Sequence, residues 1–148
     1  MESKLILGTV QFGIDYGVNN SIGKLEENQV LELFKIAHDQ GIRILDTAEV
    51  YGNAHEIIGN FHKKNNSRFK IITKFPHGIK YDSIHNKVLE YIEQLAVNSI
   101  EVLMFHSFES FQTNYKALDS LKELKSKGYI KNVGVSVYTN DHLKQLLN

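Results

Sequence analysis

The sequence predicts an α/β fold built on a parallel sheet, and three observations carry this prediction. Short apolar runs are each followed by a segment with helical periodicity, which implies parallel pairing through right-handed crossovers. The runs start roughly thirty to forty residues apart, the scale of successive β-α units. They are apolar at nearly every position, as is typical of strands covered on both faces. The runs are residues 4–10, 42–48, 69–75, 100–106 and 131–137.

Between these runs, apolar residues recur at helical spacing. In residues 26–41 they share one face, and Gly41 is suited to cap the helix C-terminus. Residues 82–97 repeat the pattern, with Asp82 or Ser83 expected as the N-cap. The predicted apolar faces comprise Val30, Leu33, Phe34 and Ala37 in the first helix and Ile84, Val88, Tyr91, Ile92 and Leu95 in the second. Further helices are predicted in residues 54–65, 114–128 (ending at Gly128) and 140–148.

Composition narrows the class of protein. A chain of 148 residues with 42% hydrophobic and 23% charged residues is typical of one globular domain with its own core. Seventeen Lys and Arg balance seventeen Asp and Glu, and no basic stripe points to nucleic acid or a membrane as a partner. The absence of cysteine excludes disulfides and thiolate metal sites, and no metal site is predicted. No signal peptide or membrane span is recognisable, so we expect a cytoplasmic protein.

An acid interrupts the second apolar run, within "RILDTAEVYG" (43–52). Asp46 would be costly to bury there without a partner. Lys74, at the end of the next run, can neutralise it from a neighbouring strand. Because the carboxyl ends of parallel strands share one face, we expect Tyr51 and His106 to converge on the same mouth.

These four side chains suit one kind of chemistry. A nearby ammonium makes a phenol a stronger acid because it stabilises the phenolate. Tyr51 could then protonate a carbonyl oxygen as a hydride reaches its carbon, while His106 donates a hydrogen bond to that oxygen. Each residue alone has an ordinary structural explanation, as an ion pair, a rim aromatic or a strand-end histidine. Four such residues at the ends of three successive strands favour a site.

Five motifs in order along the chain resemble the aldo-keto reductases, a family of NADP(H)-dependent (β/α)₈ TIM-barrel enzymes. The resemblance implies that Asp46, Tyr51, Lys74 and His106 form the catalytic tetrad, with Tyr51 as general acid for reduction of an aldehyde or ketone. The motifs are "LGTVQFG" (7–13), "GIRILDTAEVYGNAHEIIG" (41–59), "ITKF" (72–75), "LMFHS" (103–107) and "GYIKNVGVSVY" (128–138).

The same resemblance implies how NADPH would be held. Gly8, Thr9 and Asp46 would lie close to the cofactor, and Ser136 matches a position that contacts the nicotinamide carboxamide. The family usually follows that serine with asparagine, whereas this chain has Val137.

Only about five β-α units are recognisable, whereas a complete barrel has eight units and ~250 residues. We therefore expect residues 1–148 to be a single aldo-keto-reductase-like domain that stops after the fifth unit, as a fragment of a longer enzyme or a natural half-barrel. Such a domain would have two open sheet edges and an uncovered apolar inner face, both of which favour self-association. In isolation we expect it to bind NADPH weakly or not at all and to show little reductase activity.

The sequence leaves three functions to compare. The first is carbonyl reduction of a small-molecule substrate such as a sugar or small aldehyde. The second is a non-catalytic aldo-keto-reductase-like module for binding or regulation, or an inactive fragment. The third is a doubly wound, flavodoxin-like binder, which is disfavoured because "GTVQFGIDYG" (8–17) contains no G-x-G-x-x-G phosphate loop.

Overall fold

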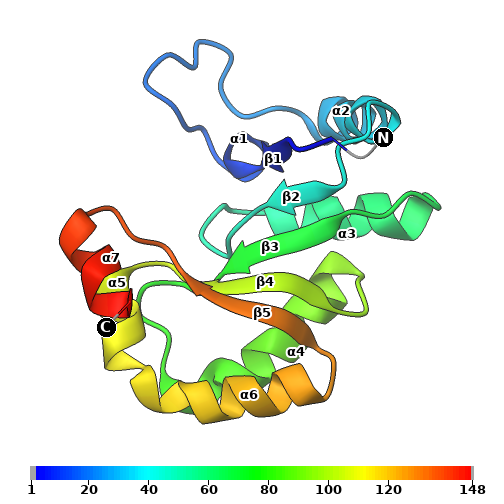
Figure 1. Cartoon of the computed structure of the whole chain (residues 1–148). Helices are drawn as coiled ribbons and strands as arrows, with labels where there is room; N and C mark the ends of the chain where they lie inside the picture. The colour runs from blue at the N-terminus through cyan, green and yellow to red at the C-terminus, as the bar shows by residue number, and fades with distance from the viewer. Residues whose placement is uncertain (1–2, 148) are drawn as a thin grey trace.

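A computed structural model describes residues 3–147, which form one five-stranded parallel sheet (Figure 1). Its strands lie in the order β1-β2-β3-β4-β5, so each pairs with its neighbour in the sequence. A doubly wound sheet reverses direction at a switch point, and this order does not; the flavodoxin-like alternative is therefore wrong. The strands are β1 (Ile6–Gly8), β2 (Ile44–Asp46), β3 (Lys70–Lys74), β4 (Ile100–Phe105) and β5 (Ile130–Val135).

The predicted helices are all present, and two short ones were not predicted. Helices α2, α3, α4 and α6 cover one face of the sheet, whereas α5 and α7 lie near the carboxyl ends of the strands (Figure 1). The unpredicted helices are α1 and α5, each too short to show a helical period. The bounds are α1 Val10–Gly13, α2 Glu27–Asp39, α3 Ala54–Lys64, α4 Ile84–Leu95, α5 Phe108–Thr113, α6 Leu118–Ser126 and α7 Asn140–Leu147.

Helix ends follow the predicted residues with one correction. Gly41 and Gly128 follow α2 and α6 with φ of 83° and 80°, the left-handed conformation in which glycine carries no Cβ penalty. Ser83 occupies the N-cap of α4 but makes no capping hydrogen bond. Its hydroxyl instead donates to the Lys80 carbonyl at 2.8 Å, because a turn of 3₁₀-helix, η1 (Tyr81–Ser83), leads into α4.

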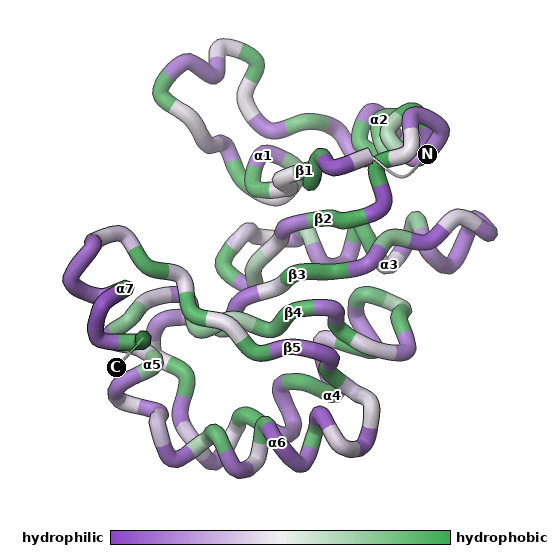
Figure 2. Tube along the Cα trace, viewed as in Figure 1, coloured by the Kyte–Doolittle hydropathy of each residue, from purple (hydrophilic) through white to green (hydrophobic). Residues whose placement is uncertain are grey.

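The core lies between the sheet and the helices that cover it. On this helix-covered face, Leu45, Ile71, Leu103 and Phe105 are at most 1% exposed. Figure 2 shows the hydrophobic segments concentrated in the strands and alternating with hydrophilic ones along the helices. The predicted helix faces are confirmed, since their members are buried or half-buried against this core: Val30, Leu33, Phe34, Ala37, Ile84, Val88, Tyr91, Ile92 and Leu95.

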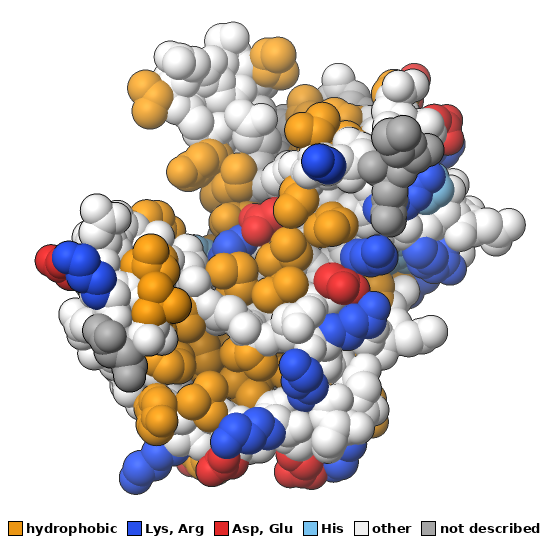
Figure 3. Space-filling model, viewed as in Figure 1, with side chains coloured by type: hydrophobic (Ala, Val, Ile, Leu, Met, Phe, Trp, Pro, Cys, Tyr) orange, Lys and Arg blue, Asp and Glu red, His pale blue; other side chains and the backbone are white. Residues whose placement is uncertain are grey.

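The opposite, helix-free face carries the other half of each strand. Strand register aligns Gly8, Asp46 and Ile72 in one row across it. Ile6 on this face is 50% exposed, and Figure 3 shows apolar side chains gathered over the strands. β1 and β5 are the edges of the sheet within residues 3–147. No helix in that range has the length and apolar character needed to cross a membrane.

Candidate active site

All four residues predicted to carry chemistry lie at the carboxyl end of the sheet. Asp46 and Lys74 are the last residues of β2 and β3, and His106 directly follows β4. Tyr51 lies in the loop of residues 47–53, which connects β2 to α3 and is called the tyrosine loop below. Parallel pairing alone brings these chain segments to one end of the molecule.

The ion pair expected between neighbouring strands is present. Lys74 Nζ lies 2.6 Å from Asp46 Oδ1 and donates a second hydrogen bond to the Thr47 carbonyl at 3.0 Å. The lysine side chain is 9% exposed and the aspartate side chain 35%. Asp46 pairs in register with Ile72, so Lys74 is two residues further along β3 and faces the same side of the sheet. Asp46 therefore compensates a largely buried ammonium.

Tyr51 packs between this pair and the histidine. Lys74 Nζ lies 5.4 Å from the centre of the Tyr51 ring, and the His106 ring meets the same ring edge-on, with 6.4 Å between centroids and planes at 89°. Close packing holds the loop, because a Cβ on Gly13 would lie only 1.6 Å from the Tyr51 carbonyl oxygen. The structure thus brings together all four residues of the predicted set.

The surroundings of His106 lower its pKa and so favour its neutral form. Burial lowers the pKa of the imidazole, and the neighbouring His77 and Lys74 lower it further, against weaker opposing effects from the Phe75 backbone and Asp46. The His77 ring lies 4.4 Å from the His106 ring. A neutral imidazole donates from one nitrogen and accepts at the other, so His106 can donate a hydrogen bond to a substrate oxygen at neutral pH.

The residues predicted to contact a cofactor surround this end of the sheet in different states of exposure. Gly8 is exposed, and a Cβ there would meet no atom within 4 Å. Thr9 is fully buried, and both its amide and its hydroxyl donate to the Asp46 carbonyl at 3.0 Å. Ser136 is half-buried, and its amide donates to the Phe105 carbonyl at 3.0 Å. Thr9 therefore fixes the end of β2.

These residues fit a nicotinamide nucleotide in two respects. The side of Gly8 is open, so a flat group can approach the β1 backbone there. Ser136 directly follows β5 and is only half-buried, so a group at this end of the sheet can still reach its side chain. Gly8, Asp46 and Ser136 would hold the nicotinamide end, with Thr9 keeping Asp46 in place.

Sequence reasoning missed a second polar cluster behind the tetrad. Glu49, in the tyrosine loop, bonds to Lys87 and Tyr91 of α4, and His55 lies beside them. Tyr91 was predicted only as a member of an apolar helix face. The available signal was Glu49 itself, a second acid between Asp46 and Tyr51.

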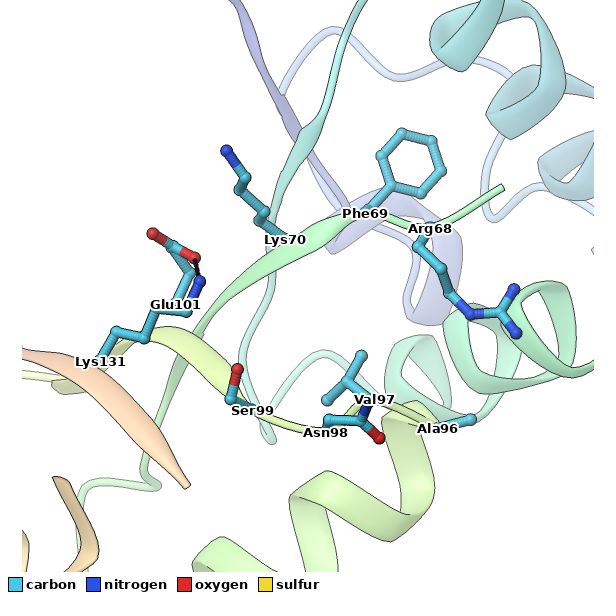
Figure 4. A pocket seen from close by; sticks show the side chains of 9 residues that line it. All are labelled: Arg68, Phe69, Lys70, Ala96, Val97, Asn98, Ser99, Glu101 and Lys131. Carbon is cyan, nitrogen blue, oxygen red and sulfur yellow. Dashed lines mark hydrogen bonds and ion pairs between the residues drawn. The ribbon is translucent and has the colours of Figure 1, made fainter. Parts of the chain in front are cut away.

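The opposite end of the sheet holds a hollow of about 360 Å³, which differs in character from the site (Figure 4). Its cationic side chains point apart, and Lys131 is paired with Glu101 at 2.8 Å. Divergent donors do not define a ligand position. Within residues 3–147 no group of three or more His, Asp or Glu residues could hold a metal ion.

Comparison with known proteins identifies the class. The aldo/keto reductase family model matches residues 4–148, so the chain belongs to the aldo/keto reductase family. It is 27% identical to the NADH-specific methylglyoxal reductase of Escherichia coli, with 98% of this chain and 51% of that protein aligned. It is 26% identical to the aldo-keto reductase YhdN of Bacillus subtilis, with 95% and 45% aligned.

Solved structures agree on the fold. A Pseudomonas aeruginosa protein described as an aldo-keto reductase matches with a TM-score of 0.80 at 27% identity, over 99% of this chain and 60% of that one. An aldo-keto reductase from Klebsiella pneumoniae in complex with NADPH matches with a TM-score of 0.71 at 20% identity, over 96% and 48%. The unclosed five-stranded sheet is thus part of a (β/α)₈ barrel architecture. The chain spans about half the length of the curated relatives it matches.

Proposed function

We propose that this chain carries the catalytic half of an NADP(H)-dependent aldo-keto reductase that reduces an aldehyde or ketone to an alcohol. One observation supports this most: Lys74, paired with Asp46, lies over the Tyr51 ring. When bound, the reduced nicotinamide supplies a hydride to the carbonyl carbon. Tyr51 donates a proton to the carbonyl oxygen, and the ammonium of Lys74 lies beside the ring that gives up this proton.

His106 orients the substrate in this proposal. Its neutral imidazole donates a hydrogen bond to the carbonyl oxygen that Tyr51 protonates, and its ring contacts the Tyr51 ring edge-on. The ion pair with Asp46 keeps the ammonium of Lys74, a side chain that is only 9% exposed, in a fixed position. We include a cytoplasmic location in the proposal, as expected from the sequence.

For the cofactor and the substrate, the proposal names a class of molecule and not one compound. NADPH is the cofactor expected from the sequence, but the related E. coli enzyme is NADH-specific, so both nucleotides belong in the test. A small aldehyde or a sugar is the proposed substrate class. Methylglyoxal reductase and the D-arabinose 1-dehydrogenase of Saccharomyces cerevisiae, which is 27% identical to this chain, are relatives that support it.

The test is oxidation of NADPH or NADH with methylglyoxal and with D-arabinose, using the protein as its gene encodes it. We expect Tyr51→Phe to lower kcat by about 100-fold or more because the general acid is lost. Tyr138→Phe, at an exposed tyrosine, is the matched control and should keep full turnover. Wild-type turnover in Tyr51→Phe would refute the catalytic proposal. Nucleotide binding without turnover in the wild type would favour the non-catalytic module.

A further inference from the structure

The tyrosine loop is bonded to helix α4 through one side chain. Glu49 Oε1 accepts a hydrogen bond from Lys87 Nζ at 3.1 Å, and Glu49 Oε2 accepts one from the Tyr91 hydroxyl. Lys87 and Tyr91 are four residues apart, so they lie on the same side of α4. Both oxygens of the carboxylate are therefore held by a single rigid element.

The α4 end of this contact is itself well fixed. Tyr91 is fully buried, with the His55 ring edge-on at 5.1 Å and the Phe75 ring at 6.0 Å. His55 in turn bonds the Thr73 hydroxyl of β3 at 2.8 Å. Burial, with the hydrogen bond to Glu49, raises the pKa of Tyr91, so its hydroxyl stays a donor. The anchor is therefore tied to the sheet as well as to the helix.

The loop end leads directly to the phenol. The Glu49 amide donates to the Lys74 carbonyl at 3.2 Å, and the Tyr51 amide donates to the Ala48 carbonyl at 3.0 Å. Glu49 is thus held at both its backbone and its side chain, and it lies within the turn that runs from Ala48 to Tyr51. Gly13 packs against the far side of the same turn. Displacement of Glu49 would move the turn that presents the phenol to Lys74.

We propose that Glu49 is a positioning residue that holds the Tyr51 ring against Lys74 by anchoring the tyrosine loop to Tyr91 and Lys87 of α4. Its effect on turnover rests on the proposed reductase function, whereas its effect on the loop does not. Glu49 acts from the helix-covered side of the sheet and takes no part in proton transfer. Through Glu49, the four residues of the tetrad gain a structural link to α4.

The first test follows the loop without any activity. Amide hydrogen exchange of residues 47–53 is measured in Glu49→Ala and in Tyr91→Phe, which retains the buried ring and removes only the hydroxyl. We expect exchange about ten-fold faster in Glu49→Ala, since two hydrogen bonds that tie the loop down are lost. Glu49→Gln, which keeps an acceptor for Tyr91, should be intermediate. Glu101→Gln breaks the Lys131 pair at the other end of the sheet and is the matched control.

If residues 47–53 exchange at the wild-type rate in both Glu49→Ala and Tyr91→Phe, the proposal that Glu49 anchors the loop is refuted. If Glu49→Ala fails to fold, Tyr91→Phe alone decides, because its packing is conserved. Faster exchange across the whole chain, including the strands, would show a general loss of stability and would also overturn a positioning role.

The second test uses turnover of the protein as its gene encodes it, with NADPH and methylglyoxal. We expect Glu49→Ala to lower kcat about ten-fold with an unchanged KM for NADPH, and to have no further effect in a Tyr51→Phe background. If Glu49→Ala lowers kcat by the same factor in the wild-type and the Tyr51→Phe backgrounds, Glu49 does not act by positioning Tyr51. If Tyr51→Phe itself keeps full turnover, the reductase proposal fails while the exchange result still stands for the anchor.

Discussion

Successive side chains of each strand point to opposite faces of the sheet, and helices cover only one of these faces. Leu103 and Phe105 point to the helix-covered face and are at most 1% exposed, whereas their neighbour Met104 on the helix-free face is only half-buried. Stability is therefore concentrated on one face. The proposed catalytic residues lie at the carboxyl rim of the other face, where Asp46 and Lys74 meet. The candidate site thus lies next to, but outside, the most tightly packed layer.

The largest expected change in stability comes from truncating a side chain on each face of the sheet and comparing the two losses. Phe105→Ala removes a fully buried ring packed against Phe75 and Phe111, and should lower the free energy of unfolding by about 4 kcal/mol. Met104→Ala, one residue away on the helix-free face, should cost about 1 kcal/mol because its site is already partly open to water. Urea unfolding of the two variants measures both. Equal losses would show that the helix-free face is covered in solution.

The free energy of unfolding should change with pH by up to about 3 kcal/mol because of a histidine in the helix-covered layer. Burial lowers the pKa of His55 from 6.5 to about 4, so the folded protein keeps this imidazole neutral. Below pH 6.5 the unfolded chain takes up the proton more readily. The stability from His55 is therefore complete above about pH 6.5 and is lost progressively as the pH falls towards 4.

Urea unfolding at a series of pH values between 4 and 7 measures this effect. His55→Asn should flatten the pH dependence over that window, at the cost of some stability at pH 7. His106→Asn, at a half-buried histidine on the rim, should change the slope less. An unchanged slope in His55→Asn would refute the assignment.

The smallest of these effects compares an ion pair at each end of the sheet. Lys74→Met leaves Asp46 without its partner, and should cost about 2 kcal/mol because the pair is largely buried, though Asp46 retains some water. Lys131→Met breaks a comparable pair with Glu101, but this lysine is 53% exposed, so we expect about 0.5 kcal/mol. Unfolding at pH 7 compares the two variants. If the two variants lose similar amounts of unfolding free energy, burial does not make the Lys74–Asp46 pair stronger than the Lys131–Glu101 pair.

Much of the site could be predicted because strand order and strand ends are visible in the sequence. Asp46, Lys74 and His106 each stand at or directly after the end of an apolar run, and parallel pairing necessarily collects such ends. The polar anchor behind them could not be predicted. Tyr91 has the spacing of an apolar helix face, and nothing local shows that its hydroxyl meets Glu49, 42 residues earlier in the chain.

Thr9 illustrates the same limit at a residue that was singled out. The family resemblance implied a cofactor contact for Thr9, and in the structure its hydroxyl is buried and donates to the Asp46 carbonyl. Contact with a cofactor stays a prediction for Gly8, Asp46 and Ser136 as well. The choice between a structural and a binding partner for a hydroxyl depends on the neighbouring strand, which sequence spacing does not describe.

By itself, the sequence determined the parallel α/β class, the position of each strand and the end of the sheet at which the tetrad gathers. Hydrophobic periodicity and chain connectivity are local properties, and they suffice for these features. Only the tertiary structure decided which polar atoms pair across the layers: Glu49 with α4, Thr9 with Asp46, and Lys74 over the Tyr51 ring. The physical reason is that a buried polar atom must find its partner in whichever element packs against it, and that element is set by three-dimensional packing.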